Sequence, residues 1–206
     1  FLRFSSGSWV DVDGSGNESV DAFPGTTSSQ AMDLSIYNSL PYIACSGLND
    51  SMYFFQQSGF AWVDADLTGR ESGMFYGATT YPNHPSLEID AAGYPHIAWS
   101  SEYGEEIYYL RWNGTAWVDA DGSGQESINI SNNALKSTVP ILKLDAAGRP
   151  NILWRQETAS GYSMYFMKHD GTGWTDVDGS GLESIEVLGM NTAFTYDMQL
   201  DSYGYP

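Results

Sequence analysis

The sequence predicts an all-β protein of the β-propeller type, built from four units of about 55 residues with four strands each. The main observation is that a tryptophan followed by an acidic stretch recurs four times, at intervals of 53, 55 and 57 residues, at Trp9, Trp62, Trp117 and Trp174. In addition, no window shows a convincing helical period over ten residues. The alternatives are a β-solenoid and a run of small sandwiches. The propeller is favoured over the solenoid because solenoid coils are usually shorter than these units.

A second repeated block supplies the first two strands of each unit. It covers residues 87–99, returns at 142–154 and begins again at 198–206. A degraded copy runs from Leu34 to Cys45, where the cysteine replaces the tryptophan that ends the block. Copies of the acidic stretch and of this block alternate along the chain, so both support one repeat architecture.

The third unit shows the expected strands most clearly. Turn signals at Asp90–Gly93, before Pro95, and at Asn113-Gly114 separate runs of alternating or aromatic residues. A further stretch, residues 126–131, returns toward the next unit. The four strands of this unit are predicted at residues 87–89, 96–100, 107–112 and 115–119.

We expect one repeat domain or segment, residues 1–206, that starts and ends in the middle of a blade. The phase of the repeat predicts either a segment of a longer repetitive surface or filament protein, or a subunit that another copy completes head to tail. The units are expected at approximately residues 1–32, 33–85, 86–140 and 141–196, with residues 197–206 starting a further unit.

The repeated motifs resemble a known kind of protein. The run Leu-Asp-x-x-Gly-x-Pro-x-Ile-x-Trp, followed by Tyr-Tyr-x-x-Trp-Asn-Gly-x-x-Trp, resembles tandem blades of bacterial secreted and cell-surface β-propellers, which are distantly similar to sialidase-like and lectin propellers. The resemblance implies an extracellular or cell-surface location. It says little about activity, because propellers carry many functions.

The net charge excludes some classes of partner. The 206 residues include 26 acidic and 8 basic ones, which gives a formal net charge of −18. This charge excludes nucleic-acid binding through a basic face and argues against docking on anionic lipid, and no apolar run is long enough for membrane insertion. The expected partners are other copies of the chain, further blades of a longer chain, or glycans.

The acidic stretch after each tryptophan predicts calcium binding. It reads Asp-x-Asp-x-[Ser/Thr]-Gly-x-Glu-Ser, and the alternating oxygens match the first half of an EF-hand loop. In the third copy Ile130 stands where an EF-hand has its bidentate carboxylate, and Glu126 is the available substitute. We expect up to four structural Ca²⁺ ions; the alternative is a solvated turn. The candidate ligand positions are Asp11, Asp13, Ser15, Asn17, Glu18, Asp64, Asp66, Thr68, Arg70, Glu71, Asp119, Asp121, Ser123, Gln125, Glu126, Asp176, Asp178, Ser180, Leu182 and Glu183.

Catalytic signals are weak. The three histidines, His84, His96 and His169, occupy unrelated places in the repeat, and no His/Cys cluster has zinc spacing. A sialidase-like glycoside hydrolase would need an arginine cluster, and Arg3 and Arg111 occupy matching blade positions that suggest a structural use. We therefore predict that the chain is not an enzyme.

Aromatic residues and sequons provide the remaining candidates. Tyr109, Trp112 and Trp117 are candidate glycan platforms, and the alternative is that these rings pack between blades. Four Asn-x-[Ser/Thr] sequons are candidate glycosylation sites, at Asn17, Asn49, Asn113 and Asn129. The sequence thus predicts an extracellular, calcium-stabilised structural or adhesive repeat protein, with carbohydrate binding as the alternative function.

Overall fold

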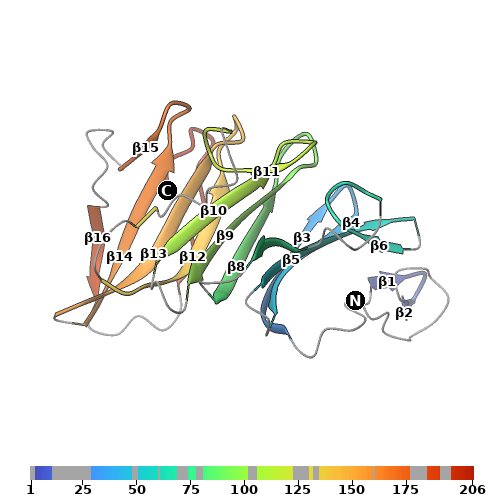
Figure 1. Cartoon of the computed structure of the whole chain (residues 1–206), viewed down its shortest axis with the longest axis horizontal. Coiled ribbons are helices and arrows are strands. Elements are labelled where there is room, and N and C mark those ends of the chain that lie inside the picture. Colours follow the sequence, from blue (N-terminus) through green and yellow to red (C-terminus); the bar gives the residue numbers. More distant parts are fainter. Residues whose placement is uncertain are drawn as a thin grey trace.

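The structure is a computed structural model, and all of its described regular structure is β (Figure 1). The described residues include no helix that is long and apolar enough to cross a membrane. They are residues 3–10, 29–47, 51–59, 61–68, 74–77, 81–101, 106–122, 130–131, 135–159, 161–176, 185–190 and 196–206.

Three antiparallel sheets, each with four consecutive strands in chain order, form units that resemble propeller blades. The second sheet stands between the other two (Figure 1). This confirms the all-β prediction and the four-stranded unit. The sheets are β3 (Ser29–Tyr37), β4 (Leu40–Gly47), β5 (Ser51–Ser58) and β6 (Ala61–Val63); β8 (Pro82–Ile89), β9 (Pro95–Ser101), β10 (Ile107–Trp112) and β11 (Trp117–Val118); and β12 (Ser137–Leu144), β13 (Pro150–Thr158), β14 (Gly161–His169) and β15 (Trp174–Thr175).

Four short strands complete the described structure. β1 (Arg3–Ser5) and β2 (Ser8–Val10) form a hairpin, while β7 (Met74–Gly77) pairs with β5 and β16 (Ile185–Met190) pairs with β14. The repeated tryptophan keeps one register in all four hairpins, since it lies opposite Phe4, Gln57, Trp112 and His169 in turn.

An aspartate organises the turn between the first two strands of a unit. Asp90 Oδ1 accepts hydrogen bonds from the backbone N–H groups of Ala92 (2.9 Å) and Tyr94 (2.8 Å). The turn then needs a left-handed residue, which Gly93 supplies with φ of 90°. The same bonds recur around Asp145 and Asp201, which explains the spacing of Asp, Gly and Pro in the repeated block.

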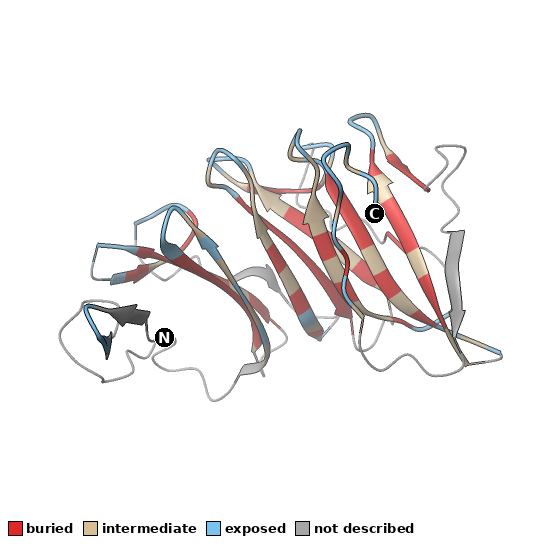
Figure 2. Ribbon diagram, turned by 180° about the vertical axis from the view of Figure 1, so that it is seen from behind, coloured by how far each residue is buried: buried red, intermediate tan, exposed pale blue. Residues whose placement is uncertain are grey.

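The core lies between neighbouring sheets, and Figure 2 shows buried residues along the strands and exposed ones at the turns. One apolar cluster joins the first and second sheets, and another joins the second and third. Every residue of β9 is buried, because Ile97 and Trp99 belong to the first cluster while Ala98 belongs to the second. In a strand that is covered on both faces, apolar residues follow one another in the sequence instead of alternating with polar ones.

Side chains also link the first strands of neighbouring sheets. Asp33 Oδ2 accepts a hydrogen bond from the Leu87 N–H (2.8 Å), and Ser86 Oγ accepts one from the Leu142 N–H (3.0 Å). Lys143 Nζ lies 2.5 Å from Glu88 Oε1. These contacts fix the relative position of successive sheets at the strand where they come closest.

Candidate functional site

A polar pocket with a volume of about 210 Å³ lies between the third sheet and the turn that follows Asp201. The third sheet provides charged and amide side chains from the ends of β12, β13 and β14, and the turn provides two tyrosines. The lining residues from the sheet are Asp145, Arg149, Asn151, Lys168, His169 and Asp170, and those from the turn are Tyr203, Gly204 and Tyr205.

Arg149 is held in a fixed orientation at this pocket. Its Nε donates to Asp145 Oδ2 (2.8 Å), and its Nη1 donates to the backbone carbonyl of Asp170 (2.8 Å). A guanidinium has five N–H groups, so several donors remain available after these two bonds. The fixed guanidinium can therefore bond a ligand oxygen without losing much side-chain freedom.

Asn151 lines the pocket and has a buried side-chain acceptor. Its side chain is 2% exposed, and its Nδ2 donates to the backbone carbonyl of Arg149 (3.1 Å). Its Oδ1 is buried and has no hydrogen-bond partner among the described residues. A buried acceptor without a donor is costly, so a ligand hydroxyl that donates to this oxygen would gain a favourable bond.

His169 and Asp170 contribute groups with defined protonation. Burial lowers the pKa of His169, so the ring is neutral near pH 7. The Gly171 N–H donates to His169 Nδ1 (3.2 Å), which places the ring proton on Nε2. Hydrogen bonds from Thr172 and Gly173 hold the pKa of Asp170 at about 2, so this carboxylate is charged.

Two exposed tyrosines lie beside these polar groups. The side chains of Tyr203 and Tyr205 are 84% and 60% exposed, and Lys168 Nζ lies 6.0 Å from the centroid of the Tyr205 ring. Exposed aromatic rings offer apolar faces next to hydrogen-bonding groups. The pocket thus combines fixed donors, one buried acceptor and aromatic faces, which suits a compact ligand rich in hydroxyl groups.

The second sheet has a histidine at the position of Asn151. His96 lies opposite Arg111 just as Asn151 lies opposite Lys168. His96 Nδ1 is 2.5 Å from the Tyr109 hydroxyl, and its Nε2 is 3.5 Å from Asp90 Oδ2. The sequence did not single out this buried Asp–His–Tyr network, although Asp90 and His96 flank one turn. His96 and Tyr109 are 2% and 1% exposed, so the network is structural and does not offer a catalytic histidine to a substrate.

The buried His96 predicts a fall in stability on acidification. Burial lowers its pKa below 6.5 against the opposing effects of Asp90 and Glu88, while Arg111 adds to the lowering. Below pH 6.5 the unfolded chain therefore binds a proton that the folded chain resists. The free energy of unfolding should be constant above that pH and decline as the pH falls toward the folded-state pKa. Urea unfolding between about pH 5 and 8 measures this.

The matched variants for this prediction are His96→Gln and His84→Gln. His84 is exposed, so its replacement should leave the pH slope unchanged, whereas His96→Gln should reduce it. His169, whose pKa burial also lowers, accounts for the slope that remains. A pH slope that is the same in wild type and His96→Gln contradicts the assignment.

The aromatic residues first considered as glycan platforms lie mostly in the core. Tyr109 is 1% exposed and packs edge-on against Trp174, with ring centroids 5.7 Å apart. Trp117 is 5% exposed and packs against Phe54 at 5.6 Å. This corrects the sequence interpretation for these two rings, which have no free face for a sugar. Trp112 is partly exposed and packs edge-on against Trp117 at 5.8 Å.

The first aspartate of three acidic loops is buried. Asp64, Asp119 and Asp176 are 0%, 4% and 3% exposed, and Asp119 Oδ1 accepts a bond from the Gly122 N–H (2.9 Å). The third-position residues Asp66 and Asp121 are exposed, and Asp66 Oδ1 accepts bonds from the Thr68 N–H and hydroxyl. Within the described residues, no group of three or more His, Cys, Asp or Glu side chains is placed to hold a metal ion.

The rest of the calcium prediction lies outside the described residues. This holds for Asp11, Asp13, Ser15, Asn17, Glu18, Arg70, Glu71, Ser123, Gln125, Glu126, Asp178, Ser180, Leu182 and Glu183, and also for the sequons at Asn49 and Asn129. The remaining sequon residue, Asn113, is exposed in the β10–β11 turn, where its Oδ1 accepts bonds from Thr115 and Ala116.

Two of the described arginines, Arg149 and Arg155, lie apart. Arg149, just before β13, and Arg155, on β13, stand six residues apart, a distance of roughly 20 Å in extended chain. Arg155 bonds the Thr138 hydroxyl and lies over the Tyr162 ring at 4.7 Å. Arg155 is therefore not part of the pocket beside Arg149.

No known protein family and no curated protein matches the chain. Among solved structures, the chain is similar to a fucose lectin from Kordia zhangzhouensis, with 15% identity, a TM-score of 0.43, and coverage of 70% of this chain and 96% of the lectin. It is also similar to a GH43 endo-arabinanase from Bacillus licheniformis, with 14% identity, a TM-score of 0.47, and coverage of 79% and 60%.

A third similar structure is the Aleuria aurantia lectin, a six-bladed β-propeller, with 14% identity, a TM-score of 0.47, and coverage of 71% of this chain and 47% of the lectin. The chain thus spans less than two thirds of the length of the arabinanase and of this lectin. Because these scores are low, a function for the chain has to be inferred from its own residues.

Proposed function

We propose that the chain binds carbohydrate in the polar pocket between its third sheet and the turn after Asp201. The observation that carries the proposal is that Asn151 lines the pocket and that its buried Oδ1 has no donor among the described residues. A sugar hydroxyl can donate to this oxygen and accept from the fixed guanidinium of Arg149 at the same time. Tyr203 and Tyr205 then offer ring faces for the apolar side of a sugar ring.

The charges of the pocket favour a neutral sugar. Arg149 and Lys168 are balanced by Asp145 and Asp170, and the neutral ring of His169 adds no charge. A pocket without a net positive charge has no electrostatic preference for a sugar acid. Glycan binding by a secreted or surface protein is a form of adhesion. Carbohydrate binding is therefore a more specific version of the structural or adhesive role that the repeats predict.

The test is a screen of neutral monosaccharides by saturation-transfer NMR, followed by titration calorimetry of the best ligand. Tyr203→Ala should weaken binding about tenfold, or ~1.4 kcal/mol, without changing the melting temperature, because this ring is almost fully exposed. Asn151→Leu should abolish detectable binding. The control is Tyr81→Ala, which removes an exposed tyrosine that does not line the pocket.

Two results would contradict the proposal. One is a complete panel of neutral sugars without any saturable ligand. The other is a ligand that binds wild type, Tyr203→Ala and Asn151→Leu with equal affinity, since that ligand would occupy a different place on the molecule.

We propose calcium binding by the acidic loops as a second, stabilising property. The observation in its favour is that the first aspartate of the loop is buried in Asp64, Asp119 and Asp176, next to an exposed third-position carboxylate in the first two of these loops. Carboxylate and hydroxyl oxygens are the donors that Ca²⁺ prefers. Gln56 Nε2 donates to the backbone carbonyl of Asp64 (2.9 Å) and so fixes the start of one loop.

A further inference from the structure

The turn between β10 and β11 contains the only Asn-Gly dipeptide in the sequence, Asn113-Gly114. Asn113, Gly114 and Thr115 are all exposed. In such a dipeptide the side-chain carbonyl carbon of asparagine lies next to an unhindered backbone nitrogen, and a five-membered ring can close between the two atoms. The turn therefore exposes a pair of groups that can react with each other.

The fold requires glycine at position 114. Gly114 has a φ of 99°, in the left-handed region that residues with a Cβ rarely adopt. A Cβ at this position would also lie 2.8 Å from the Tyr94 hydroxyl oxygen. The backbone nitrogen of Gly114 donates no hydrogen bond to any residue that the structure describes. The nitrogen next to Asn113 is thus both unhindered and available for reaction.

Three donors hold the side-chain oxygen of Asn113. Its Oδ1 accepts hydrogen bonds from the N–H groups of Thr115 and Ala116 and from the Thr115 hydroxyl, each at 2.9 Å. Because two of these donors are backbone N–H groups, the accepting atom must be the oxygen and not the amide nitrogen. Nδ2 makes no hydrogen bond within the described part of the chain, so its departure would break no contact there.

We propose that Asn113 is a site of spontaneous deamidation in the folded protein, with water as the only co-reactant. The Gly114 nitrogen gives up its proton to the solvent and attacks Cγ of Asn113. The Cγ–Nδ2 bond then breaks, and Nδ2 takes up a proton and leaves as ammonia. Water opens the resulting succinimide at the new N–Cγ bond, which gives aspartate. The negative charge that develops on Oδ1 during the attack meets three donors, as in an oxyanion hole.

The third sheet shows that the product fits this turn, because it has an aspartate at the equivalent position. Asp170 is followed by Gly171, which has a φ of 104°. Asp170 Oδ1 accepts bonds from the Thr172 N–H (2.7 Å), the Thr172 hydroxyl (2.7 Å) and the Gly173 N–H (3.0 Å). A carboxylate binds such donors more strongly than an amide oxygen does. Conversion of Asn113 should therefore preserve the turn and add one negative charge.

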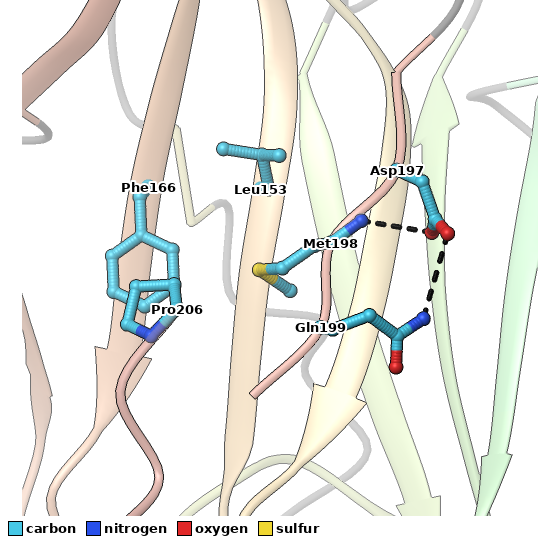
Figure 3. A pocket seen from close by; sticks show the side chains of 6 residues that line it. All are labelled: Leu153, Phe166, Asp197, Met198, Gln199 and Pro206. Carbon is cyan, nitrogen blue, oxygen red and sulfur yellow. Dashed lines mark hydrogen bonds between the residues drawn. The ribbon is translucent and has the colours of Figure 1, made fainter. Parts of the chain in front are cut away.

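The test incubates the whole chain in mildly alkaline buffer and follows each side-chain amide by peptide mapping and mass spectrometry. Asn113 should convert first, and the converted protein should melt at the same temperature as Asn113→Asp. Asn38 is exposed but followed by serine, so it should convert much more slowly. Gln199 is an exposed glutamine whose Nε2 donates to Asp197 Oδ2 at 3.4 Å (Figure 3). It should keep its amide, because its longer side chain would have to close a six-membered ring.

Two variants test the role of the turn itself. Thr115→Val removes one donor at nearly constant shape and should slow the conversion of Asn113 roughly threefold to tenfold, the effect of one hydrogen bond. In urea, where the turn is lost, this difference should disappear. Asp170→Asn creates a second Asn-Gly dipeptide with the same three donors, so it should revert to aspartate at a rate similar to that of Asn113.

Three outcomes would overturn the proposal. The first is an Asn113 that keeps its amide while other asparagines convert. The second is a folded Thr115→Val variant that converts as fast as wild type, since the three donors would then have no part in the reaction. The third is a converted protein that melts well below Asn113→Asp, which would show that the succinimide opens at the main-chain carbonyl and gives isoaspartate instead.

Discussion

Replacement of Trp154 by alanine is expected to lower the free energy of unfolding by about 3–5 kcal/mol. Its ring is completely buried in the second interface and stacks on Tyr165, with ring centroids 6.1 Å apart. The mutation removes this packing from two sheets at once and leaves a cavity. Domain stabilities are only about 5–15 kcal/mol, so the variant should be close to unfolded at 37 °C. Urea unfolding at 25 °C measures the loss.

The matched control is Trp112→Ala, which removes the same side chain from a position that is only partly buried. It should cost clearly less than Trp154→Ala. Trp154 Nε1 donates to Gln156 Oε1 (3.3 Å), but that oxygen also accepts a bond from Ser137, so the loss comes from packing rather than from the hydrogen bond. Equal losses in the two variants would show that the second interface is not the centre of the core.

Removal of calcium is the second prediction with a large expected effect. An ion held at ten times its dissociation constant stabilises the folded form by about 1.4 kcal/mol for each site. For a domain of this size each kcal/mol is worth about 2–4 °C, so several sites together should lower the melting temperature by roughly 10 °C when EDTA is added. Restoration by Ca²⁺ is expected. Calorimetric scans with EDTA and with excess Ca²⁺ measure the difference.

Two single substitutions distinguish bound calcium from a general salt effect. Asp119→Asn removes a buried loop carboxylate and should reduce the response to EDTA. Asp170→Asn changes an exposed carboxylate outside the loops, and Asn113 shows that asparagine forms the equivalent turn, so this variant should respond like wild type. A melting temperature that is indifferent to EDTA would remove the calcium assignment.

The repeated elements of the fold were accessible from the sequence because local chemistry determines them. An aspartate that binds two N–H groups of its own turn needs glycine three residues later, so the pattern around Asp90 predicts the turn. The hairpin before Trp117 follows from Asn113-Gly114 in the same way. The side of the sheet to which Tyr109 and Trp117 point could not be predicted, because strands covered on both faces lack polar alternation.

The pocket was missed because it arises from differences between repeats. Arg149 and Asn151 stand where the second sheet has Tyr94 and His96, so neither belongs to the pattern that the repeats share. The replacement of Tyr94 and His96 by Arg149 and Asn151 at equivalent positions is the sequence signal that indicates the pocket. A buried position that changes from histidine to asparagine loses the bonds to Asp90 and Tyr109 and leaves an acceptor free.

The burial of β9 on both faces has a consequence for the way in which the molecule opens. The second sheet cannot separate from its neighbours without disrupting two apolar clusters at once. Opening of this sheet should therefore need the loss of both described interfaces. Amide hydrogens of Ile97, Ala98 and Trp99 should then exchange with solvent only when the whole molecule unfolds.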